Sequence, residues 1–467
     1  MKITLHHLGP IEQAEIDLRP LTVFIGRNNT GKTWATQAIG AMFGSTMYEA
    51  YASLYTTKKI LDTYSLLDEV VESIIREGNA QLDWKQLVEE LGEELFTNLK
   101  NFAIKNLARF IGTELVTFDQ LQMDFDFVEI KPKLYNHVIR NTVNASTGLL
   151  NSRIDISTNL LNFTTEQDSS RLYFFTQTQG SILDKLPAQQ IKMFVMHVVL
   201  TLMRLTFYPR VAIFPTERAT FINFSSYSQR NSLVNEKQDI PESLPRKIPT
   251  SVSLFARMLG LILDANLADR QEEIKDNPRL AAYFDLANIL ETEILGGQIS
   301  INVSKLGLQK EFIFQTNGVN LEVSASSSMI KELAPLVLYL RYLAQPGELI
   351  IIDEPEMNLH PQAQVELMEF LAMLVNAGLH VLITTHSPYI VDHLVNLIAA
   401  ARYENKAEAQ ELLFLERSEA FISQDKVSVY LFENGTATNV LDDKGIIHWG
   451  TFGEVSNYLS DIYARLI

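Results

Sequence analysis

The sequence predicts an α/β fold in which helices flank a parallel sheet, and two observations lead to this prediction. First, the runs 21–25, 349–352 and 379–385 are short, apolar and rich in β-branched residues. Such runs are typical of strands that are buried on both faces. Second, the first run is followed, after the short segment 26–33, by a segment, 34–42, whose composition is helical. A strand that is followed by a helix is the repeating unit of a parallel sheet.

The most informative segment joins the first strand-like run to its helix. It reads G-x-x-x-x-G-K-[ST], the pattern of a phosphate-binding loop. Its residues are Gly26, Arg27, Asn28, Asn29, Thr30, Gly31, Lys32 and Thr33. In such a loop the backbone N–H groups point at phosphate oxygens, Lys32 adds a positive charge, and the Thr33 hydroxyl can ligate Mg²⁺. A glycine-containing turn can match this pattern by chance, but the strand before it and the helix after it favour the phosphate loop.

Two adjacent carboxylates, Asp353 and Glu354, end the second strand-like run. Ligands of open parallel sheets bind beyond the carboxyl ends of the strands. We therefore expect Asp353 to hold Mg²⁺, directly or through water, and Glu354 to polarise the attacking water. The two side chains point to opposite sides of the chain, so they can take different roles. Alone, the motif would favour a solvated acidic turn, and its pairing with the phosphate loop reverses that preference.

Lys32 and Asp353 lie far apart in the chain, so a large insertion must separate the two halves of one nucleotide domain. In this respect the chain resembles the ABC-type ATPases of the SMC and RecF kind. The resemblance implies an ABC-type P-loop ATPase domain, split in sequence by a largely helical insertion. It also implies ATP and Mg²⁺ as cofactors and hydrolysis of ATP to ADP and phosphate.

Two further segments match that resemblance. The run PEMNLHP, from Pro355 to Pro361, resembles the D-loop of this group. The third strand-like run ends at His386, and Ser387 and Pro388 suit the N-cap and first position of a following helix. The resemblance makes His386 the counterpart of the switch histidine, which contacts the γ-phosphate and the attacking water. His360 and His380 are interpreted as structural.

The serine-rich segment 324–329 precedes an apolar helix, where ABC-type proteins carry the signature L-S-G-G-Q or a serine-rich variant. Serine hydroxyls and N–H groups at a helix N-terminus form an anion site. No glycine is present, so the register stays open between Ser326 and Ser327, and a simple serine-rich N-cap and turn is the alternative. In the family this site closes over the γ-phosphate bound by another subunit. The resemblance therefore implies a homo-oligomer of at least two chains with composite ATP sites.

The chain departs from the family at one position of the phosphate loop, and it offers several candidates for the family's glutamine. Asn29 stands where relatives often have glycine, and asparagine tolerates a left-handed backbone better than other non-glycine residues. The glutamine that relatives use to sense Mg²⁺ and γ-phosphate has four candidates: Gln120, Gln122, Gln177 and Gln179.

Within the group, the chain is most similar to the small OLD-like, AAA-type ATPases of bacterial phage defence. The similarity lies in the N-terminal run MKITLHHLGPIEQAEIDLRPLTVFIGRNNTGKT, in the run IFPTER at 213–218, in DEPEMNLHP, and in the C-terminal KVSVYLF…GIIHWGTFGEVSNYL. ATPase subunits of two-component systems such as PARIS and Septu fit this size. The resemblance implies a switch that controls a separate effector, a nuclease or toxin, with DNA or a phage protein as the trigger.

Two alternatives remain for the function. A RecF-like DNA-repair ATPase would bind duplex DNA directly, and the net charge of −17 disfavours it without excluding a local basic strip. An OLD-like nuclease would carry a metal-binding TOPRIM domain after the ATPase. The residues that follow Ala401 are too few for that domain at usual sizes.

Composition and patterning divide the 467 residues into parts. With 46% apolar residues, the chain is globular and can hold two or three domains. We expect the N-terminal half of the ATPase at 1–45, a mainly helical insertion at 46–205, a mixed segment at 206–326, and the C-terminal half at 327–467. Smaller expectations are helices at 65–75, 84–110 and 251–294, β-like patches at 115–130 and 171–178, a polar loop at 221–250, and short strands at 298–324.

The remaining expectations concern environment and one arginine. Zero cysteines exclude structural disulfides. No apolar run reaches the roughly 18 residues that span a bilayer, and no secretory leader opens the chain, so a cytoplasmic location without membrane contact is expected. Arg218 follows the strand-like run 211–214, where it could contact a phosphate or a facing subunit. A surface pair with Glu217 is equally favoured.

Overall fold

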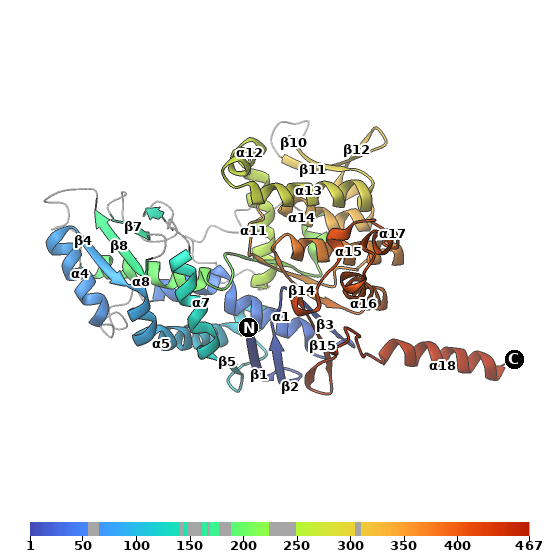
Figure 1. The fold of residues 1–467 in the computed structure, drawn as a ribbon, viewed down its shortest axis with the longest axis horizontal. Helices are drawn as coiled ribbons and strands as arrows, with labels where there is room; N and C mark the ends of the chain where they lie inside the picture. The colour runs from blue at the N-terminus through green and yellow to red at the C-terminus, as the bar shows by residue number, and fades with distance from the viewer. Residues whose placement is uncertain are drawn as a thin grey trace. The chain divides into compact units, whose positions relative to one another are not determined.

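A computed structural model describes residues 1–54, 65–140, 144–146, 161–165, 169–176, 188–223, 249–303 and 310–466. The chain forms two compact units, whose ribbons are drawn in Figure 1. Unit 1 consists of Met1, Ala41–Asn106 and Phe125–Arg210, and unit 2 of Lys2–Gly40, Leu107–Asp124 and Val211–Ile467.

Unit 2 is built on a nine-stranded sheet of order β5-β1-β2-β16-β15-β3-β14-β13-β9. Its strands are β1 (Lys2–Leu8), β2 (Ile11–Asp17), β3 (Leu21–Gly26), β5 (Gln122–Phe125), β9 (Val211–Phe214), β13 (Leu349–Asp353), β14 (His380–Thr385), β15 (Val427–Glu433) and β16 (Thr436–Asn439). A separate three-stranded sheet contains β10 (Gln298–Val303), β11 (Lys310–Thr316) and β12 (Val319–Glu322).

Five neighbouring strands of the large sheet, β15, β3, β14, β13 and β9, run parallel. They come from distant parts of the sequence yet lie side by side (Figure 1). Every residue of β3 and β13 is buried, as expected for strands covered on both faces. Because the strands are parallel, the ends of β3, β14 and β13 lie at one edge of the sheet. The predicted α/β fold class is therefore confirmed, and the segment that follows the central strand β3 is the one predicted to be a phosphate loop.

Unit 2 also contains helices. They are α1 (Lys32–Phe43), which continues into unit 1, α6 (Leu107–Ile111), α9 (Arg218–Asn223), α11 (Thr250–Asp264), α12 (Leu267–Asp276), α13 (Ala281–Ile289), the π-helix η4 (Leu290–Leu295), α14 (Ser328–Tyr342), α15 (Pro361–Asn376), α16 (Pro388–Arg402), α17 (Lys406–Glu411) and α18 (Thr451–Leu466). Four single-turn 3₁₀ helices, η3 (Pro278–Leu280), η5 (Val323–Ala325), η6 (Ser418–Ala420) and η7 (Gln424–Lys426), lie between them.

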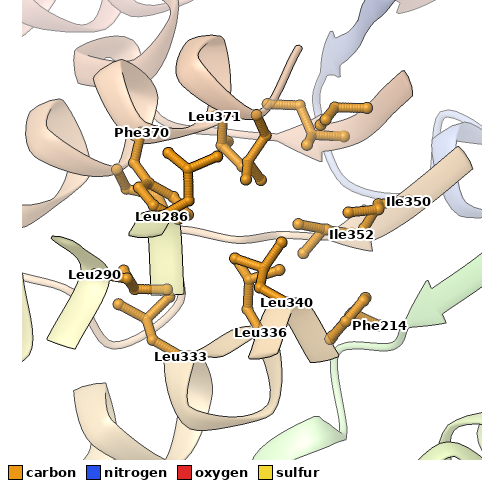
Figure 2. Packing of buried hydrophobic residues seen from close by; sticks show 14 of the residues in the cluster. Phe214, Leu286, Leu290, Leu333, Leu336, Leu340, Ile350, Ile352, Phe370 and Leu371 are labelled. Atoms are coloured by element: carbon orange, nitrogen blue, oxygen red, sulfur yellow. The ribbon is translucent and has the colours of Figure 1, made fainter. Parts of the chain in front are cut away.

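The core of unit 2 centres on α14. Figure 2 shows Leu333, Leu336 and Leu340 of this helix packed among side chains of the sheet and of the helical segments α13, η4 and α15. The sheet contributes Phe214, Ile350 and Ile352, and the helical segments contribute Leu286, Leu290, Phe370 and Leu371. Burial of each such aliphatic or aromatic side chain contributes about 1.5–3 kcal/mol. This packing fixes the helix that follows the serine-rich segment against the strand that ends in Asp353.

Unit 1 combines helices with a four-stranded antiparallel sheet of order β4-β8-β7-β6. Its elements are α2 (Ser45–Leu54), α4 (Ser65–Glu77), β4 (Asn79–Asp83), α5 (Trp84–Lys105), α7 (Phe127–Arg140), β6 (Asn144–Ser146), β7 (Leu161–Thr165), β8 (Arg171–Thr176) and α8 (Ala188–Leu205). The expected helices at 65–75 and 84–110 are confirmed, the second broken between α5 and α6. The strand at 171–176 is confirmed, whereas β4 and β7 were not anticipated.

The expected β-like patch at 115–130 is correct only for Gln122–Phe125. Helix α7 already begins at Phe127, because the side chain of Asp126 accepts a hydrogen bond from the N–H of Val128 at 2.9 Å. An aspartate in this position satisfies a free N–H group of the first helical turn and favours a helix start. The polar loop expected at 221–250 lies mostly outside the described residues.

Among the described residues, no single helix is both long and apolar enough to cross a membrane. One pair, α11 and α12, meets the test of length and composition when taken together, with a bend of 92° between them.

Candidate nucleotide-binding site

The phosphate loop connects β3 to α1 in unit 2, as predicted. Gly26 and Gly31 have φ angles of 138° and 103°, which side chains rarely tolerate. A Cβ on Gly26 would also lie 2.4 Å from the carbonyl oxygen of Phe432 on β15. Asn29 has a φ of 63°, so the expected left-handed asparagine is confirmed. The loop therefore adopts a backbone that its two glycines and one asparagine make accessible.

Lys32 turns its ammonium group into the loop. Its Nζ donates hydrogen bonds to the carbonyl oxygens of Gly26, at 2.9 Å, and Arg27, at 2.8 Å. The residue is only 5% exposed, and this burial lowers the pKa of the Lys32 amine. The carboxylates of Glu354 and Asp353 oppose that shift and favour the charged form. The geometry thus places a cation inside a loop of backbone dipoles, next to two carboxylates.

Thr33 and Asp353 meet across the site. The Thr33 hydroxyl donates to Asp353 Oδ2 at 3.2 Å, and the Thr384 hydroxyl donates to Asp353 Oδ1. Asp353 is 8% exposed, and burial raises the pKa of its carboxyl while the Thr384 hydrogen bond opposes the rise.

The donor set of Thr33 and Asp353 fits Mg²⁺. A hydroxyl and a carboxylate supply hard oxygens, and protein-bound Mg²⁺ usually takes one or two carboxylates together with phosphate oxygens. In the described part of the chain, no group of three or more His, Asp or Glu side chains is arranged to hold a metal ion. A Mg²⁺ ion held by Thr33 and Asp353 would have coordination positions left for phosphate oxygens.

Glu354 and His386 are brought together by the pairing of β13 with β14. Asp353 lies opposite Thr384 in the register. Glu354, directly after Asp353, and His386, two residues after Thr384, therefore lie at the same edge of the sheet. Glu354 Oε1 lies 3.0 Å from His386 Nε2, and this hydrogen bond lowers the pKa of the Glu354 carboxyl. Both side chains are about one-third exposed. A carboxylate that stays ionised and reaches solvent is placed to accept a proton from water.

Glu356 lies two residues further along, and no role was predicted for it from the sequence. Its Oε1 accepts hydrogen bonds from the Thr385 hydroxyl, at 2.6 Å, and from the His386 N–H, at 2.8 Å. Burial raises the pKa of the Glu356 carboxyl. The residue fixes the backbone at the end of β14 and thereby the position of His386. The only feature of the sequence that could have pointed to this role is the position of Glu356 in the run DEPE.

The expectation for Arg218 is wrong on both counts. The residue is 1% exposed, so it forms no surface pair with Glu217 and is covered from phosphates and facing subunits. Its Nε lies 2.8 Å from Glu332 Oε2 of α14, and its guanidinium donates to the carbonyl oxygens of Asp353 and Glu354. Burial lowers the pKa of Arg218, and Glu332 opposes this shift. Nothing in the run IFPTER distinguishes a buried arginine from an exposed one.

Comparison with known proteins identifies the family. A family profile described as AAA ATPase domain matches residues 1–391. The chain belongs to this family. It is therefore an ATPase, and ATP is its nucleotide. A search of curated protein sequences finds no significant match.

Solved structures similar to this AAA ATPase include SMC head domains. An SMC head bound to the C-winged helix domain of ScpA has a TM-score of 0.38 and 10% sequence identity. The match covers 94% of this chain and 96% of the SMC head chain. The SMC head domain from Thermotoga maritima has a TM-score of 0.32 and 11% identity, with 94% and 97% covered. An SMC head domain from Pyrococcus furiosus, with an extended coiled coil and bound to the C-terminal domain of ScpA, has a TM-score of 0.34 and 10% identity, with 99% and 98% covered.

The candidate signature serines of the AAA ATPase lie at the start of α14. The Ser326 hydroxyl donates to the carbonyl oxygen of Val323 at 2.6 Å, within its own turn. Ser327 is the N-cap residue, with an exposed side chain that makes no capping hydrogen bond. The signature role of both serines stays a prediction.

Helices α15 and α16 of the AAA ATPase begin with the caps predicted from the sequence or with a histidine in that role. Ser387 caps α16 by accepting from the N–H of Ile390, and Pro388 occupies the first position, as predicted. His360 caps α15 in the same way, which agrees with its structural interpretation. Gln120 and Gln122 are exposed, whereas Gln177 and Gln179 lie outside the described residues.

Proposed function

We propose that this AAA ATPase is an ATP-hydrolysing switch that self-associates around its nucleotide and controls a separate effector protein, a nuclease or toxin, in bacterial defence against phage. The defence role is supported by the resemblance of the N-terminal run and of DEPEMNLHP to OLD-like ATPases. DNA or a phage protein would be the trigger.

The observation that carries the hydrolytic part is the contact of 3.0 Å between Glu354 and His386 beside the phosphate loop. Lys32 and the loop N–H groups bind the phosphates, and Thr33 and Asp353 hold Mg²⁺. The bound metal supplies charge neutralisation at the phosphate oxygens. Glu354 accepts the proton of the attacking water, and His386 orients the Glu354 carboxylate and hydrogen-bonds the reacting groups. Each role uses a side chain at the carboxyl edge of the parallel strands.

Self-association is supported by the exposed start of α14. Ser327 and the helix N-terminus present hydroxyl and N–H donors toward solvent, where they suit an anion held by another copy. In this arrangement each copy carries one phosphate loop and one set of serines, and a complete site needs both copies.

The test is Glu354→Gln, which removes the carboxylate but keeps the shape and leaves Asp353 and Thr33 in place. ATP should still bind, and phosphate release should fall by about 10²–10⁴, as is usual when one general base is lost. The exposed Glu404→Gln serves as the control and should behave as wild type. Phosphate release that persists in Glu354→Gln would assign the proton transfer to another residue. In cells with the intact gene cluster, the same variant should lose protection against phage, scored by plaque counts.

A further inference from the structure

Glu354 has a strained backbone. Its φ is 47°, a left-handed value that residues other than glycine and asparagine seldom adopt. Such a conformation persists only where the surroundings determine it, and it occurs preferentially at functional sites. The direction of the Glu354 carboxylate therefore depends on the groups that hold this residue.

Two elements hold the backbone of Glu354. On one side, its N–H donates to the carbonyl oxygen and to the hydroxyl oxygen of Thr384, both at 3.1 Å. On the other side, Arg218 donates from Nη1 to the carbonyl oxygen of Asp353, at 2.7 Å, and from Nη2 to that of Glu354, at 2.9 Å. A guanidinium is a planar fork with fixed donor directions, so one side chain fixes two consecutive carbonyls.

Arg218 is itself fixed by α14. Glu332, in the second turn of that helix and 2% exposed, forms an ion pair with Arg218, in which Nε lies 2.8 Å from Oε2, and its carbonyl oxygen accepts a hydrogen bond from Nε at 3.3 Å. The other carboxylate oxygen of Glu332 accepts a hydrogen bond from Asn358 Nδ2 at 3.0 Å. Asn358 belongs to the turn after Glu354 and also has a left-handed φ, 61°. A buried cation is stable only when it is paired and hydrogen-bonded, so the positions of Arg218, Glu332 and Asn358 depend on one another.

We infer that Arg218 is a positioning residue, which directs the Glu354 carboxylate toward His386 through the two carbonyls and is held in place by Glu332 and Asn358. The inference rests on the hydrolytic role proposed for Glu354. It also connects the start of α14, where Ser326 and Ser327 lie, to the turn that carries Glu354. A movement of α14 when another copy binds would reach Glu354 through Glu332 and Arg218.

The experiment uses Arg218→Lys, which keeps the positive charge but loses the fork. The matched control is Arg270→Lys. Arg270 is also buried, at 4% exposure, and also pairs with a glutamate, Glu273 at 2.7 Å, but its backbone contact is the Ala344 carbonyl, outside the nucleotide site. Amide hydrogen exchange of the nucleotide-free protein and steady-state ATP hydrolysis are measured for both.

In Arg218→Lys, the amides of 353–358 should exchange faster, and kcat should fall by about 10²-fold, as a small misplacement of a catalytic group can cause. The Kd for ATP should stay within about threefold, because the phosphate loop is untouched. Arg270→Lys should change neither the exchange of 353–358 nor kcat. Unchanged exchange in Arg218→Lys, or an equal loss of kcat in Arg270→Lys, overturns the inference.

Glu332→Gln is the second variant, for the case in which Arg218→Lys does not fold. The glutamine keeps the size of the side chain and an acceptor for Asn358, so we expect the same changes at a smaller size. If wild type releases no phosphate, the hydrolytic proposal fails, whereas hydrogen exchange still decides whether Arg218 holds the 353–358 turn.

Discussion

The environment of each residue at this site is set by its burial and by its hydrogen bonds to backbone and side-chain groups. Lys32 lies among loop carbonyls, and Asp353 receives two threonine hydroxyls. Glu354 stays partly exposed and hydrogen-bonded to His386. The motif letters indicated which residues carry charge, but the φ of Glu354 and the burial of Arg218 have no signature in the sequence. Both depend on residues more than a hundred positions away in the chain.

Lys32→Ala should abolish ATP binding, because the loop loses the cation that lies among its carbonyls while β3 and α1 stay intact. Calorimetric titration with ATP and Mg²⁺ measures the effect, and circular dichroism checks the fold. Lys275→Ala is the control, since Lys275 is 69% exposed on α12 and pairs only with Glu272 among the ion pairs described. Equal affinity in folded Lys32→Ala would contradict the assignment of the loop.

Elements are placed by the parallel register of the sheet. β14 lies between β3 and β13, so the phosphate loop, the aspartate and the histidine arrive at the same edge from three distant segments. The apolar face of α14 packs on the sheet and on α13 and α15 (Figure 2). Ser327 and Ser328, at the N-terminal end of α14, are exposed. The helix that follows the two serines is therefore held by the core, while its N-terminal end stays accessible.

Replacement of Ser326 and Ser327 together by tyrosine should leave ATP binding intact but stop hydrolysis, because bulky side chains block the approach of a nucleotide bound to another copy. Ser418→Tyr, at another exposed helix start, is the control. Nucleotide affinity and phosphate release are measured on the same preparations. Normal turnover in the double variant would leave the serine-rich N-cap as the better interpretation of this segment.

At the scale of the whole molecule, the chain carries one phosphate loop and one Asp-Glu strand end among its described residues. The proposed composite site then requires at least two copies. Unit 1 has its own core, in which α4 and α8 are joined by an ion pair of 2.6 Å between Lys192 and Asp68. The domain boundaries expected from the sequence, such as 46–205 for the insertion, stay predictions.

We expect light scattering to show an oligomer of at least two chains without nucleotide. A mixture of Lys32→Ala with the Ser326/Ser327 double variant should recover part of the wild-type phosphate release, because each supplies the half-site that the other lacks. Each variant alone, at the same total protein concentration, is the control. A monomer whose turnover per chain is independent of protein concentration would contradict the composite site.

Local patterns were sufficient for much of the fold. The apolar runs at 21–25, 211–214 and 349–352 predicted β3, β9 and β13 correctly, and Ser387 with Pro388 predicted the start of α16. In each case the decisive signal lies within a few residues. The strands of unit 1 were mostly missed: β4 is short and pairs with β8 across a long stretch of chain, and β7 is a short strand that pairs with the nearby β8.

The sequence by itself determined the chemistry: a phosphate loop with Lys32, a strand that ends in Asp353 and Glu354, and a histidine at the end of a neighbouring strand. These follow from residue type and short-range spacing. Only the tertiary structure decided that Arg218 is buried against Glu332 and that it holds the carbonyls of a strained Glu354. The physical reason is that a buried ion pair and a left-handed backbone are stabilised by groups distant in sequence, so no local pattern records them.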